Sequence, residues 1–93
     1  MDEPLGSDAA KRLIRQILQS GRFAYTKHAT NELLADDLTT VDCENVLRGG
    51  VVRPGEYEHG TWRYRVETSR VIVVVAFRSE NEFVIVTAWR VER

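Results

Sequence analysis

Two arginines stand at alternate positions in the C-terminal half of this chain, in the segment Trp62-Arg63-Tyr64-Arg65-Val66. Successive side chains of a β-strand point to opposite faces of a sheet. If Trp62, Tyr64 and Val66 face a core, Arg63 and Arg65 face the other way. Guanidinium groups bind phosphate through paired hydrogen bonds. The pattern therefore indicates a sheet face suited to phosphate or nucleic acid.

The next two segments add candidates of the same kind. One apolar run ends on Arg78, and the last segment ends on the pair Trp89-Arg90. We expect Arg78 and Trp89 to share a face with Arg63. The two arginines would hold a phosphate while the indole stacks on a base. Arg65 and Arg90 are further candidates for substrate binding.

These residues also have ordinary structural explanations. Charged side chains on the outer face of a strand keep a sheet soluble. Trp89, close to the chain end, can equally cap the core or cover a helix of a partner protein. Trp62 and Tyr64 are typical core residues.

Length and composition limit the number of domains and the classes of function that the chain can have. The 93 residues predict one domain, 1–93, with a single modest core. The net charge of −1 excludes a strongly basic nucleic-acid binder but leaves room for a local basic face. One cysteine, Cys43, excludes an internal disulfide, and with two histidines it leaves little for a zinc site. We therefore expect neither a metal nor a cofactor. No apolar run approaches the roughly 18 residues of a membrane span, so we expect a cytoplasmic protein.

The hydrophobic periodicity changes at Gly50. Before it, helical spacing and capping residues predict three helices within about 7–48, with N-caps at Ser7 or Asp8, at Thr26, and at Thr39 or Thr40. After it, alternation predicts strands within about 50–90, over 51–57, 62–67, 71–77 and 83–90. The first strand is weak because Pro54-Gly55 interrupts it, and 22–25 is expected to be an extended link. This order predicts an α+β fold, with N-terminal helices packed on one face of a small, mainly antiparallel sheet of three to four strands.

Short motifs along most of the chain support a family resemblance. They are His28-Ala29 at a helix start, Arg63-Tyr64 in a strand, and the closing strand Val84-Ile85-Val86-Thr87-Ala88-Trp89. The chain resembles the MqsR-type toxins and a related uncharacterised domain family, both within the RelE-like ribonuclease fold.

The resemblance implies a bacterial toxin that cleaves messenger RNA without a metal, either free or in association with the ribosome. It also implies a cognate antitoxin protein that inhibits the toxin. It adds His28 to Arg63 and Arg78 as candidate catalytic residues. The MqsR-type pattern has a polar residue after a strand Trp, which is Arg63 here. It has a Tyr in the next strand and a Lys in the last strand, where this chain has Ile72 and Trp89. A non-catalytic module that keeps the fold and binds a protein partner is the alternative.

Overall fold

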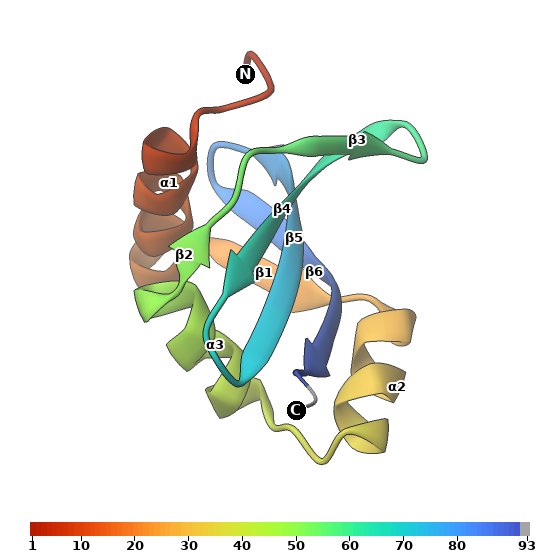
Figure 1. Ribbon diagram of the computed structural model, residues 1–93. Coiled ribbons are helices and arrows are strands. Elements are labelled where there is room, and N and C mark those ends of the chain that lie inside the picture. Colours follow the sequence, from red (N-terminus) through yellow and green to blue (C-terminus); the bar gives the residue numbers. More distant parts are fainter. Residues whose placement is uncertain (92–93) are drawn as a thin grey trace.

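The computed structural model describes residues 1–91, in which three helices precede most of a six-stranded sheet. Figure 1 shows their arrangement. In chain order the elements are α1 (Ser7–Ser20), β1 (Arg22–Tyr25), α2 (Lys27–Ala35), α3 (Thr40–Gly49), β2 (Val51–Val52), β3 (Glu56–Glu58), β4 (Thr61–Glu67), β5 (Val71–Ser79) and β6 (Glu82–Arg90). The fold class is α+β, as the sequence predicts. Residues 1–91 contain no helix with the length and hydrophobicity of a membrane span.

Local capping signals define two of the three helix starts. The Thr26 hydroxyl accepts a hydrogen bond from the backbone N–H of Ala29, which satisfies a donor at the start of α2. Thr39 and Asp42 form a reciprocal capping box at the start of α3. The prediction for α1 was wrong in detail, because its N-cap is Gly6 and no side chain caps it.

The sheet is larger than the predicted three to four strands. Its order is β1-β6-β5-β4-β2, and β3 pairs with β4 beyond the end of β2. All pairs are antiparallel except β1 with β6. Arg22–Tyr25 was expected to be a link, but it is the edge strand β1 and lies parallel to residues 82–85 of β6. The expected strand 51–57 is divided at Pro54-Gly55 into β2 and β3, because proline cannot donate to a strand ladder.

One apolar core joins the helices to one face of the sheet. Along β5 the odd-numbered side chains from Val71 to Phe77 are in this core, together with the fully buried Tyr64 of β4. The helices contribute Ala10, Ile14, Ile17, Ala29, Leu33, Cys43, Val46 and Leu47. Val74 and Ala76 are buried but lie outside the core cluster, on the opposite face of β5. We call this opposite face the open face.

The outer edge of β6 is covered by a strand along its first half and by a helix along its second half. β1 ends at Tyr25, opposite Ile85, and the chain then turns into α2, which lies beside the end of β6 (Figure 1). Polar groups replace the missing strand here. The Thr26 hydroxyl donates to the carbonyl of Val86, and the Asp36 carboxylate accepts from the backbone N–H of Arg90. These contacts fix the position of the last strand.

Candidate functional site

Strand register places the candidate side chains on the open face. Arg65 of β4 lies opposite Val74 of β5, and Val74 lies opposite Thr87 of β6. In the next row, Ile72 lies opposite Trp89. The prediction that Trp89 shares a face with Arg63 is confirmed.

A β-bulge in β6 makes this arrangement possible. Strict alternation would put Trp89 on the same face as Ile85, which is fully buried in the core. The pairing shifts between Val74 and Val75, so that their partners on β6 are Thr87 and Ile85, and Val86 is the additional residue. Ile85 therefore stays in the core while Trp89 reaches the open face.

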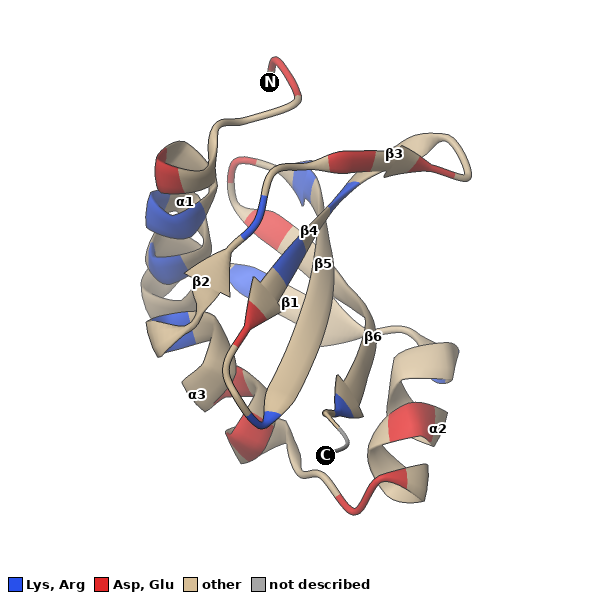
Figure 2. Cartoon of the chain, in the orientation of Figure 1, with Lys and Arg blue, Asp and Glu red and all other residues tan. Residues whose placement is uncertain are grey.

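The open face carries a small hollow of about 110 Å³. Three strands of the sheet and β3, which continues along the edge of β4, line it with Glu56, Glu58, Arg63, Arg65, Val74, Thr87 and Trp89. Figure 2 shows the acidic β3 beside the basic positions of β4. The hollow is smaller than the roughly 300–1,000 Å³ of typical small-molecule sites. An open face with a small polar hollow suits one group of an extended polymer better than an enclosed small molecule.

Opposite charges meet in this hollow without close hydrogen bonds. The Arg63 guanidinium lies 4.0 Å from the Glu58 carboxylate, and the Arg65 guanidinium lies 4.0 Å from Glu56 and 3.9 Å from Glu67. Charge-assisted N–H···O bonds are near 2.7–2.9 Å, so these pairs leave guanidinium donors free for another acceptor. The Arg63 side chain is only 23% exposed, which strengthens its interactions relative to those of a fully solvated arginine.

Trp89 contacts the guanidinium group of Arg65. The guanidinium carbon of Arg65 lies 5.7 Å from the centroid of the Trp89 ring, which is a cation–π arrangement. Both side chains line the hollow with Arg63. The structure therefore brings together Arg63, Arg65 and Trp89, three of the six residues that the sequence indicated.

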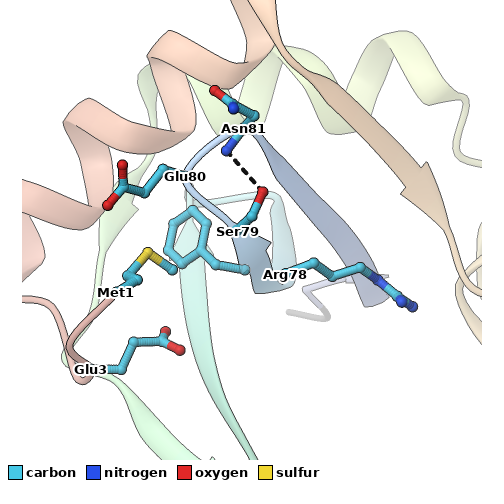
Figure 3. A pocket seen from close by; sticks show the side chains of 7 residues that line it. Met1, Glu3, Arg78, Ser79, Glu80 and Asn81 are labelled. Carbon is cyan, nitrogen blue, oxygen red and sulfur yellow. Dashed lines mark hydrogen bonds between the residues drawn. The ribbon is translucent and has the colours of Figure 1, made fainter.

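Arg78 does not line the hollow. It is exposed at the end of β5, beside the turn that leads into β6. Figure 3 shows its side chain extending away from Met1, Glu3 and Glu80, which line a separate surface depression with it. The structure therefore does not place Arg78 with Arg63 around one phosphate.

His28 and Arg90 lie elsewhere. His28 is exposed near the start of α2, and α2 contributes no residue to the lining of the hollow. Arg90 has a structural contact. Its guanidinium donates hydrogen bonds to the backbone carbonyls of Asp36 and Asp37, which tie the end of β6 to the loop after α2.

Sequence reasoning missed the two carboxylates of the hollow, Glu56 and Glu58. The signal that locates them is the turn at His59-Gly60, where both residues have positive φ. A hairpin closed at this turn pairs Glu58 with Thr61 and Glu56 with Arg63. Counting back from the turn would have placed both acids beside the arginines.

The side chains with a raised pKa lie away from the hollow. Burial and two neighbouring acids raise the pKa of the Cys43 thiol to about 11, so this cysteine is a packing residue and a poor nucleophile. Burial is also the largest cause of the raised pKa of Tyr25, whose hydroxyl donates to the carbonyl of Thr40. Within residues 1–91, no cluster of three or more His, Cys, Asp or Glu side chains could hold a metal ion.

No family model, curated protein or solved structure matches the chain.

Proposed function

We propose that this chain is a RelE/MqsR-like toxin domain that cleaves RNA without a metal, and that the hollow on the open face is its active site. The observation that carries the proposal is the meeting of two carboxylates, two guanidinium groups and an indole in one hollow on a sheet. This set contains what the reaction needs: a proton acceptor, cations for a phosphate and a surface for a base.

The reaction follows from these groups. Glu56 or Glu58 accepts the proton of a ribose 2′-hydroxyl, and the 2′-oxygen attacks the adjacent phosphorus. The bond from phosphorus to the 5′-oxygen breaks, and that oxygen takes a proton from water. The products are a 2′,3′-cyclic phosphate and a 5′-hydroxyl. Arg63 and Arg65 stabilise the negative charge that builds up on the phosphate oxygens.

Trp89 would position the nucleotide. Base–aromatic stacking contributes about 1–3 kcal/mol per base and depends little on base identity. This contact holds one base next to the reacting phosphate without demanding a particular sequence. Arg78, His28 and Arg90 lie outside the hollow, so in this proposal the chemistry does not depend on them.

Growth of a bacterial host after induction of this chain tests the proposal. Wild type is compared with Arg63→Ala, Glu58→Gln and His28→Ala, with Arg70→Ala as a matched control on the turn between β4 and β5. Arrest with loss of transcript integrity is expected for wild type, His28→Ala and Arg70→Ala. Relief is expected for Arg63→Ala and, where Glu58 rather than Glu56 is the proton acceptor, for Glu58→Gln. Normal growth with abundant folded wild-type protein would contradict the toxin proposal.

A second candidate is a non-catalytic module that binds a protein on the same open face. The favouring observation is the ion pairing of Arg63 and Arg65, which balances charge that a phosphate site would keep free. Ile72 and Trp89, both partly exposed, add apolar surface on that face. The toxin proposal also calls for a protein here, a cognate antitoxin that covers the hollow. Growth arrest that is relieved when a small neighbouring gene is co-expressed is expected for a toxin with its antitoxin. It is not expected for a non-catalytic module.

A further inference from the structure

We propose that the RNA strand continues from the hollow around the β2 edge of the sheet and onto the outer side of α1 and α3. The path consists of Arg53, Arg48, Arg15 and Arg12, which we call the basic track. This inference rests on the proposed function, because the track starts at the proposed site of cleavage.

The first step of the track adjoins the hollow. The backbone N–H of Arg53 donates to the carbonyl of Arg65 at 2.8 Å, so Arg53 lies directly beside β4. A second hollow of about 340 Å³ opens here, lined by Arg53, Pro54, Gly55, Glu56, Arg65 and Glu67. It shares Glu56 and Arg65 with the first hollow, which makes the two depressions neighbours.

The second step leads from the sheet edge to the helices. Arg48 is in the last turn of α3, directly before β2, and α1 contacts β2. The Arg15 side chain crosses from α1 and donates to the carbonyl of Arg48 through Nε and an NH₂ group, at 3.1 and 2.9 Å. A hollow of about 340 Å³ lies at this junction, lined by Arg15, Leu18, Gln19 and Arg48. Arg12 lies one turn before Arg15 on the exposed side of α1.

Charge distinguishes the helical part of the track from the hollow. Arg53, Arg63 and Arg65 have carboxylate partners, and the Arg53 guanidinium lies 3.1 Å from the Glu67 carboxylate, whereas Arg12, Arg15 and Arg48 form no ion pair within residues 1–91. Figure 2 shows basic positions on α1, on the link between β2 and β3, and on β4. Unpaired arginines in a row attract a chain of evenly spaced negative charges. Continuity with a hollow that holds carboxylates, cations and an indole favours a nucleic-acid backbone over an acidic peptide.

The track predicts that affinity depends on RNA length. The test variant is Arg12→Gln, Arg15→Gln and Arg48→Gln combined. The matched control is Arg22→Gln, Lys27→Gln and Arg70→Gln, which removes the same charge from positions off the track. Binding of single-stranded RNA of about three and about twelve nucleotides is measured by fluorescence anisotropy, since basic grooves cover about 4–16 nucleotides. A noncleavable backbone with 2′-O-methyl groups keeps binding separate from cleavage, and circular dichroism checks the fold.

The expected result is a loss of about tenfold or more in affinity of the track variant for the longer RNA at low salt. Its slope of log affinity against log salt falls by about 2, since each phosphate contact to a single strand contributes about 0.7. Affinity for the short RNA and the behaviour of the control stay close to wild type. Equal affinities of track variant and wild type for the longer RNA would overturn the proposal, as would equally good competition by a poly-glutamate peptide. Length-dependent binding without any cleavage of unmodified RNA would support the basic track as an RNA-binding surface and would contradict the proposed catalytic function.

Discussion

Substituting Glu58 by glutamine should separate binding from chemistry. The change keeps the shape of the side chain but removes both the charge beside Arg63 and one of two proton acceptors in the hollow. An exposed ion pair contributes about 0–1 kcal/mol, so freeing Arg63 should tighten RNA binding by up to about fivefold. If Glu58 is the base, the rate of cleavage should fall by about 10²–10⁴-fold.

The comparison with Glu56→Gln identifies the base. Glu56 has the same relation to Arg65, also at 4.0 Å, and a similarly exposed side chain. Both variants should bind RNA more tightly, but only the one that lacks the base should lose cleavage to this extent. The assay is single-turnover cleavage of a short labelled RNA, with affinity measured on the noncleavable analogue. Weaker binding by both variants, or unchanged cleavage by both, would refute the assignment of these carboxylates.

Three further predictions concern the scaffold. Tyr64→Phe should lower the free energy of unfolding by about 1–3 kcal/mol, measured in urea, because the buried hydroxyl accepts from the N–H of Leu5 and donates to Glu3. Burial is the largest cause that raises the pKa of Tyr64 to about 12 from 10.0. The contribution of Tyr64 to stability is therefore complete below pH 10 and is lost as the pH rises toward 12, so alkaline melting curves of Tyr64→Phe should converge with wild type. Gly50→Ala should cost about 1–3 kcal/mol, since the added Cβ would lie 2.7 Å from the carbonyl oxygen of Val46, whereas Gly49→Ala meets nothing within 4 Å and serves as the thermal-denaturation control.

Local signals account for the parts of the fold that the sequence predicts. The caps at Thr26 and Thr39 involve residues three positions apart, so the helix starts are readable from neighbours in the chain. Alternation along β5 likewise separates the core side chains from Val74 and Ala76.

Long-range pairing accounts for what the sequence did not predict. The four residues of β1 are too short to show a period, and they become a strand only by pairing with β6, about sixty residues later. The bulge at Val86 likewise depends on the register between β5 and β6.

The candidate site was predicted in part for the same reasons. Arg63 and Arg65 follow from alternation, and Trp89 reaches their face through the bulge. The structural role of Arg90 could not be predicted, because its hydrogen bonds to the loop after α2 join segments that are distant in the sequence and show no common sequence motif. The carboxylates of Glu56 and Glu58 required the hairpin register.

The most direct test of the central claim is incubation of the purified 93-residue protein with a defined RNA in the presence of EDTA, followed by analysis of the RNA ends. The proposed function predicts fragments that carry 2′,3′-cyclic phosphate and 5′-hydroxyl ends, and it predicts that Arg63→Ala abolishes them while Arg70→Ala does not. Intact RNA with folded wild-type protein, or equal cleavage by Arg63→Ala, would contradict it.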